Sequence, residues 1–161
     1  MKTWGLGYEK AKEKAKKIYS KIGVIPCPIF NDEKVAFTSR GFNHLVRKGR
    51  IPRPKNEQKK RFTLLQYAER MLKQPSHRVK IEFEEKEIIE KTRKFGSPIL
   101  VKKKARAWAI TEEIDGCVVK LIISQVEGRQ KEFLSIMGDK GIKIDNKNNG
   151  KQKTPPKGDD L

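Results

Sequence analysis

The sequence lacks any apolar run of the roughly 20 residues that a helix needs to cross a bilayer, and it lacks the N-terminal apolar stretch of a secretory signal. Cysteine and histidine are scarce, since only Cys27, Cys117, His44 and His77 are present. Residues so few and so far apart cannot supply the paired ligands of a closed zinc site. We therefore expect a cytoplasmic protein that engages no membrane, binds no metal or other cofactor, and keeps its thiols reduced.

Acidic residues are too few to balance the basic ones. The chain has 38 Lys and Arg against 20 Asp and Glu, a formal net charge of +18. DNA, RNA and anionic lipid all fit such a charge, because each neutralised phosphate releases condensed counterions. Lipid fits least well, since the lysine-rich helix expected at residues 9–21 lacks the large apolar side chains that membrane insertion needs.

Length and composition predict one domain with loose ends. The 161 residues divide into an N-terminal helix or extension at 1–23, a main domain at 24–140 and a tail at 141–161. The tail is rich in Asn, Lys, Gly and Pro, so we expect it to be disordered and basic.

Apolar periodicity predicts three helices in the first half of the chain. They are expected at residues 9–21, at 40–48 before Gly49, and at 57–73, the last with apolar side chains at helical spacing. A short strand is expected at 34–38, after a loop in which prolines forbid helix.

The second half predicts a sheet. A strand at 79–85 is expected to lead into a short helix at 87–95, and runs at 99–114, 117–127 and 131–137 are expected to pair as an antiparallel meander with an Asp115-Gly116 turn. Helices followed by strands predict an α+β fold, with N-terminal helices packed on a four- or five-stranded antiparallel β-sheet.

Basic side chains surround one histidine. Arginines at 40, 47 and 50 flank His44 and would draw a phosphate toward its imidazole, which makes His44 a candidate for acid–base chemistry; the alternative is a packed or surface histidine. The residues expected to bind nucleic acid are Arg40, Arg47, Arg50, Arg53, Lys55, Lys59 and Lys60, unless they form only a solvated helix face.

Polar residues of the last hairpin alternate with apolar ones. Ser124, Gln125, Gln130, Lys131 and Ser135 include residues expected on one open sheet face. A cleft between that face and the helix bearing His44 would hold a phosphodiester, with Lys131 on its nonbridging oxygens. Open sheet faces are also commonly polar without any such role.

Four separated segments occur in the order seen in one nuclease group: Phe37 to Leu45, Arg53 to Phe62, Ser124-Gln125, and Gly128 to Ser135. Over roughly residues 24 to 137 the chain resembles the phage and mobile-element branch of the barnase, EndoU, colicin D and RelE-like nuclease superfamily. Ser124 stands where an arginine is common in that branch.

The resemblance implies helices against an antiparallel sheet, with His44, Arg61, Gln125, Lys131 and Ser135 grouped as the active site. It also implies a cytotoxic RNase, with tRNA as one candidate substrate and an immunity or antitoxin protein as partner.

The resulting hypothesis is a toxin-type, metal-independent endoribonuclease that cleaves RNA by transesterification through the 2'-hydroxyl. His44 would be general base or acid, Lys131 and Arg61 would stabilise the phosphorane, and the other two residues would orient the phosphate. The alternative is a non-catalytic basic nucleic-acid-binding accessory protein of a mobile element, for which the basic patch alone suffices.

Overall fold

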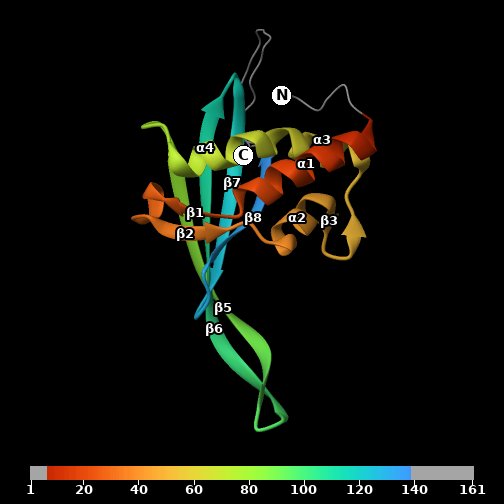
Figure 1. The fold of residues 1–161 in the computed structure, drawn as a ribbon. Helices are drawn as coiled ribbons and strands as arrows, with labels where there is room; N and C mark the ends of the chain where they lie inside the picture. The colour runs from red at the N-terminus through yellow and green to blue at the C-terminus, as the bar shows by residue number, and fades with distance from the viewer. Residues whose placement is uncertain (1–6, 139–161) are drawn as a thin grey trace, which may run out of the picture.

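The computed structural model describes residues 7–138 (Figure 1), so the tail expected at 141–161 lies outside the described residues. The helices are α1 (Tyr8–Ile22), α2 (Ser39–Val46), α3 (Lys55–Leu64) and α4 (Ala68–Lys73). The strands of the main sheet are β1 (Val24–Cys27), β2 (Glu33–Ala36), β5 (Lys80–Lys94), β6 (Ser97–Ile114), β7 (Cys117–Val126) and β8 (Lys131–Gly138). A short pair, β3 (Arg47–Lys48) and β4 (Ile51–Pro52), follows α2.

The α+β class is confirmed, but the expected sheet differs from the observed one. Six strands lie in the order β1-β2-β8-β7-β6-β5, and all neighbours are antiparallel except β2 and β8, which are parallel. The helices do not all precede the sheet, because β1 and β2 come before α2. The segment expected as a proline-bearing loop forms β1, which tolerates Pro26 because it is the outermost strand.

The prediction of a short helix at 87–95 is wrong. Residues Lys80–Lys94 form one continuous strand that pairs with β6 from Lys80↔Thr111 to Lys94↔Ser97. Cross-strand pairing outweighs the weak helix preference of this segment. A tight turn closes the hairpin, with positive φ angles of 53° at Phe95 and 82° at Gly96, as the twist of paired strands favours.

The other elements follow the sequence more closely. The helix expected at 9–21 is α1, and the helix at 40–48 is α2 with its last two residues in β3. The helix expected at 57–73 is interrupted by a 3-10 turn at Leu65–Tyr67, which divides it into α3 and α4. The antiparallel meander is confirmed as β6, β7 and β8.

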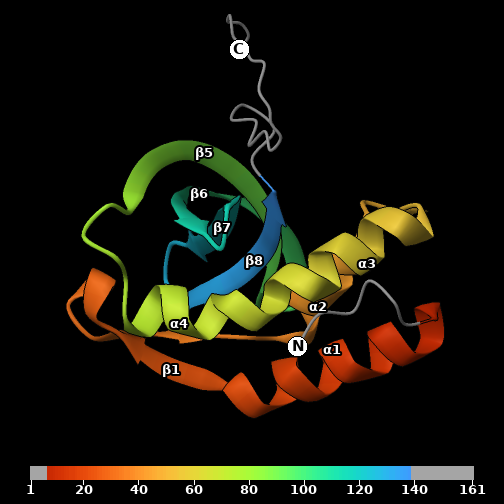
Figure 2. The same cartoon turned by 90° about the horizontal axis from the view of Figure 1, so that it is seen from above.

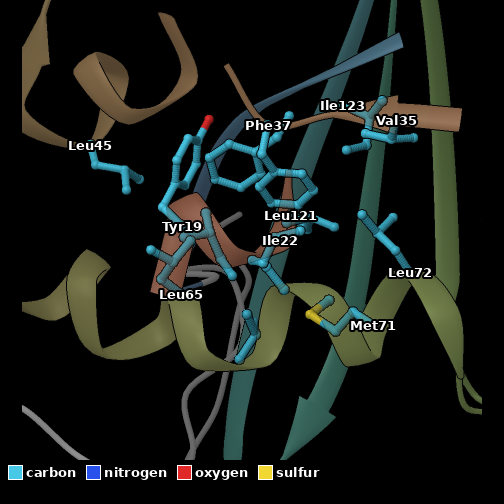
Figure 3. Packing of buried hydrophobic residues seen from close by; sticks show 14 of the residues in the cluster. Tyr19, Ile22, Val35, Phe37, Leu45, Leu65, Met71, Leu72, Leu121 and Ile123 are labelled. Carbon is cyan, nitrogen blue, oxygen red and sulfur yellow. The ribbon is translucent and has the colours of Figure 1, made fainter. Parts of the chain in front are cut away.

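The hydrophobic core lies between the helices and one face of the curved sheet. Helices α1, α3 and α4 gather on the same side of the sheet (Figure 2), and Tyr19 of α1 lies beside Phe37 within the core (Figure 3). The ring of Tyr19 meets the rings of Phe37, Phe42 and Phe133 edge-on at centroid distances of 5.4 to 5.6 Å. Such aromatic pairs add about 0.5 to 1.5 kcal/mol each beyond burial.

Helix α2 packs closely against β8, at the point where β2 ends. The register of β2 on β8 stops at Ala36↔Glu132, and a Cβ at Gly41 would lie 2.5 Å from the carbonyl oxygen of Phe133. Only glycine therefore lets the first turn of α2 approach this backbone. The close approach brings Thr38 and Arg40 to the side of Glu132.

Candidate active site

A shallow pocket opens where α2 meets the turn between β7 and β8. It is lined by Arg40, Ser124, Gln125, Val126, Arg129, Gln130 and Glu132. Two arginines from different elements thus share a concave surface with one carboxylate and two side-chain amides. Cations beside an acid–base group are what phosphodiester chemistry requires.

Glu132 is the acidic group of this pocket. It is partly buried, and the Thr38 hydroxyl donates to its Oε1 over 3.4 Å. Burial raises the pKa of the Tyr19 hydroxyl, and the negative charge of Glu132 raises it further, so the carboxylate lies near that ring too. Sequence reasoning missed Glu132, although it is the one acidic residue between Lys131 and Gly138.

Arg129 and Gln125 shape the far wall of the pocket. Arg129 is exposed and pairs with Glu90 of β5 at 3.0 Å. Gln125 donates from Nε2 to the backbone oxygen of Arg129 over 2.9 Å, and its Oε1 accepts from Lys131 over 3.4 Å. Both ends of the Gln125 amide are therefore engaged in holding the β7–β8 turn.

Lys131 does not face the pocket as a free cation. Lys131 is only 7% exposed. Its Nζ donates to Glu33 Oε1 over 2.6 Å and lies 4.6 Å from the centre of the Trp108 ring. The carboxylate and the ring compensate its charge inside the protein. Lys131 is thus placed to support Gln125 rather than to meet a phosphate directly.

Arg61 and Ser135 come together, as the resemblance implied, but in a buried network. Arg61 is 9% exposed and donates from Nη1 to Ser135 Oγ over 2.8 Å and to the carbonyl oxygen of Ile136 over 3.3 Å. Its Nε and Nη2 both reach Glu57 Oε2, at 3.2 and 3.0 Å. The guanidinium therefore ties α3 to β8.

Loss of this network is expected to destabilise the fold. Replacing Arg61 by methionine keeps the volume but leaves Ser135 and the Ile136 carbonyl without their donor, and is expected to lower the free energy of unfolding by about 2 kcal/mol. The expected loss of stability is modest because the Glu57 side chain is 41% exposed and can bind water once Arg61 is removed. Urea unfolding followed by circular dichroism measures it.

The matched control is Arg106→Met, which breaks the surface ion pair with Glu85 and is expected to change stability far less. Equal losses for the two variants would contradict the structural role of Arg61.

His44 lies one helical turn beyond Arg40, and it is not among the residues that line the pocket. Its Nδ1 is buried and has no hydrogen-bond partner among the described residues. Burial lowers the pKa of the imidazole, and the charges of Arg53, Arg40 and Arg61 lower it further. His44 is therefore close to the arginines and prefers the neutral form.

This depressed pKa gives a pH-dependent stability. The unfolded chain binds the His44 proton near its ordinary pKa of 6.5, whereas the folded protein resists protonation. The contribution of His44 is therefore present above that pKa and is lost as the pH falls through the lower folded pKa. His44→Gln is expected to reduce the loss of stability between about pH 7 and pH 5.

The measurement is the urea midpoint of each protein at both pH values. The control variant is His77→Gln, at an exposed position before β5. An unchanged pH slope in His44→Gln would contradict the prediction.

The basic residues expected to bind nucleic acid differ in exposure. Arg53 is turned inward, because its Nε donates to the His44 carbonyl oxygen over 2.9 Å and its Nη1 pairs with Glu57 at 3.1 Å. The exposed members of the set are Arg40, Arg47, Arg50, Lys55 and Lys60, while Lys59 is partly buried. The outward cations thus form a surface around α2 and the start of α3.

The five catalytic candidates do not form one cluster. The structure joins Arg61 to Ser135 near the middle of β8 and Gln125 to Lys131 at its start, and puts His44 near the first pair. Of the five, only Gln125 lines the pocket. The residues that sequence reasoning left out of this group, Glu132 and Arg129, supply the pocket's carboxylate and its second arginine.

In comparisons with known proteins, no family model, no curated protein and no solved structure matches the chain. Within residues 7–138, no helix is long and apolar enough to pass through a membrane. Over the same residues, no three His, Cys, Asp or Glu side chains gather as a metal site would need.

Proposed function

We propose that the protein is a metal-independent endoribonuclease that cleaves RNA by attack of the 2'-hydroxyl on the adjacent phosphate. The observation that carries this proposal is the pocket in which Glu132 lies with Arg40 and Arg129. A carboxylate can take the proton of the attacking hydroxyl, and two guanidinium groups can stabilise the charge that builds on the phosphate oxygens.

In the proposed reaction, Glu132 accepts the proton of the 2'-hydroxyl as the 2'-oxygen forms a bond to phosphorus. The bond from phosphorus to the 5'-oxygen of the next nucleotide then breaks. The products are a 2',3'-cyclic phosphate and, once the leaving oxygen is protonated, a 5'-hydroxyl. Arg40 and Arg129 bind the nonbridging oxygens throughout.

We assign the second proton transfer to His44. Positions four apart on a helix lie on the same side, with Cβ atoms about 5 to 6 Å apart, so the imidazole of His44 follows Arg40 along α2. An imidazolium whose pKa is lowered is a stronger proton donor, although a smaller fraction carries the proton at neutral pH.

Four of the sequence-derived candidates become positioning residues in this account. Lys131 and Gln125 hold the turn that carries Arg129, and Arg61 with Ser135 fixes α3 on β8. The proposed setting is the cytoplasm, with RNA as substrate, tRNA as one candidate within it, and an immunity or antitoxin protein restraining the enzyme.

The test is incubation of the full chain with total RNA and, separately, with DNA of mixed sequence, both in excess EDTA. The expected result is RNA cleavage with intact DNA, since DNA lacks the attacking hydroxyl. Intact RNA would reject the proposal.

A non-catalytic nucleic-acid-binding protein is the second candidate, favoured by the exposed cations around α2. It would bind RNA and DNA duplexes alike, with strong salt dependence and no product.

A further inference from the structure

The β5–β6 hairpin continues well beyond the rest of the sheet. The register of β7 on β6 ends at Ala105↔Val126, yet β5 and β6 remain paired through eight further positions, from Glu87↔Lys104 to Lys94↔Ser97. At about 3.4 Å per residue this two-stranded arm, residues 87–104, is roughly 25 Å long. Figure 1 shows it extending away from the body.

One face of the arm alternates apolar and basic side chains. Cross-strand partners lie on the same face, so Ile89 lies opposite Lys102 and Lys91 opposite Leu100. Ile89 is 64% exposed and Leu100 is 69% exposed. Large apolar side chains on an isolated ribbon gain nothing from the protein's own core, which indicates that something else covers them.

The tip of the arm presents an aromatic ring. Phe95 is 95% exposed and has a φ of 53°, which the tight hairpin turn requires although bulky residues rarely adopt it. Lys94 Nζ lies 5.8 Å from the centre of its ring. The tip therefore offers a free aromatic surface beside a positive charge.

The charge of the arm favours a polyanion. Residues 87–104 contain six basic side chains, namely Lys91, Arg93, Lys94, Lys102, Lys103 and Lys104, and the acidic residues Glu87 and Glu90. Glu90 is already paired with Lys103 at 3.3 Å and with Arg129 at 3.0 Å. Its negative charge therefore does little to offset the cations that face outward.

We propose that the arm holds unpaired nucleotides of the RNA substrate, with a base stacked on Phe95, a second base against Leu100, and phosphates bound by Lys91 and Lys102. This inference rests on the proposed function and names how its substrate is held. Single strands are favoured over duplexes, because a base can stack on an aromatic ring only when its own face is free.

The root of the arm adjoins the pocket. Arg129 lines the pocket and also pairs with Glu90 of the arm, and the backbone amide of Lys104 donates to Glu127 in the β7–β8 turn over 2.9 Å. Glu90 projects from the face of the ribbon opposite Lys91 and Leu100, so an RNA strand bound on that face would pass around the edge of the arm to reach Arg129 and Glu132.

The experiment measures binding of the full chain to a fluorescein-labelled single-stranded RNA in which every sugar is 2'-O-methylated. This probe cannot be cleaved by the proposed reaction, so the result is independent of the proposed activity. Phe95→Ala is expected to weaken binding at least about fivefold, the low end for loss of one base stacked on an aromatic ring, and Leu100→Ser is expected to weaken it by loss of apolar contact. Replacing Lys91 and Lys102 by alanine is expected to lower the salt slope by about 0.7 per lysine.

The matched control is Val24→Ala, which shortens an exposed apolar side chain, 53% exposed, on the edge strand β1 outside the basic surface around α2, and is expected to leave binding unchanged. The same variants are tested with duplex RNA, with phosphatidylserine vesicles and by light scattering for self-association.

The inference is overturned by unchanged single-strand binding in Phe95→Ala, or by an equal loss of duplex binding. It is also overturned if the arm variants reduce vesicle binding or dissociate a dimer and leave RNA binding intact. If the protein binds RNA through the arm but cleaves no RNA, the proposed nuclease activity is rejected and the inference about the arm stands.

Discussion

Replacement of Glu132 by glutamine is expected to lower kcat for RNA cleavage by at least about 100-fold, the low end for loss of a general base. Glutamine keeps the shape of the side chain and its hydrogen bond to the Thr38 hydroxyl, but it cannot accept the proton of the attacking 2'-hydroxyl. KM is expected to change little, because Arg40 and Arg129 still hold the phosphate. Initial rates on a fluorogenic RNA oligonucleotide in EDTA measure both constants.

The control for this substitution is Glu113→Gln, an exposed carboxylate on β6 outside the pocket, for which the wild-type rate is expected. An equal urea midpoint for Glu132→Gln and wild type shows that the fold is intact. Full activity in Glu132→Gln would remove the carboxylate from the mechanism.

Replacement of Gly41 by alanine is expected to have the largest effect on stability. The new Cβ would lie 2.5 Å from both the Phe133 carbonyl oxygen and the Tyr19 hydroxyl oxygen, so α2 must move away from β8. Overpacking of this kind costs about 1 to 3 kcal/mol, and the upper end is expected here because the colliding Phe133 carbonyl oxygen is a backbone atom that cannot turn aside. Activity is expected to fall as well, since Arg40 moves with α2.

Urea unfolding measures the effect, with Gly138→Ala as the control. A Cβ at Gly138 would meet its nearest neighbour, the Val118 carbonyl oxygen, at an ordinary 3.9 Å, and is expected to cost far less. If the two alanine variants are equally stable, the close packing of α2 on β8 does not limit this fold.

Local signals in the sequence predicted the parts of the fold that depend on neighbours along the chain. The amphipathic helix α1 buries Ala11 and Ala15, which the 3.6-residue periodicity singles out. The Asp115-Gly116 turn joins β6 to β7 as its composition indicates. These elements need only local pairing or one apolar face.

The rest of the sheet depends on contacts that are distant in sequence. The parallel pairing of Val35 with Lys131 leaves no local pattern in the sequence. The strand β1 contains Pro26, a residue that ordinarily indicates a loop or turn. The continuous strand β5 has helix-forming residues in its second half, where only its partner β6 decides the outcome.

The candidate site was predicted in part for the same reason. The basic residues around His44 pointed to Arg40, and strand alternation with the family resemblance pointed to Gln125; both residues line the pocket. These signals could not tell which basic residues are neutralised inside the protein, because Lys131 pairs with Glu33 and Arg61 bonds to Ser135, contacts that join residues far apart in the sequence. Glu132 was overlooked because a strand glutamate is unremarkable until a fold places arginines around it.

Analysis of cleavage ends most directly tests whether this pocket performs 2'-hydroxyl chemistry. The substrate is a DNA oligonucleotide with a single ribonucleotide, incubated with the protein in EDTA and examined by mass spectrometry. Cleavage only after the ribonucleotide, leaving a 2',3'-cyclic phosphate and a 5'-hydroxyl, is the expected result. Ends bearing a 3'-hydroxyl and a 5'-phosphate, or cutting of an all-DNA control, would contradict it.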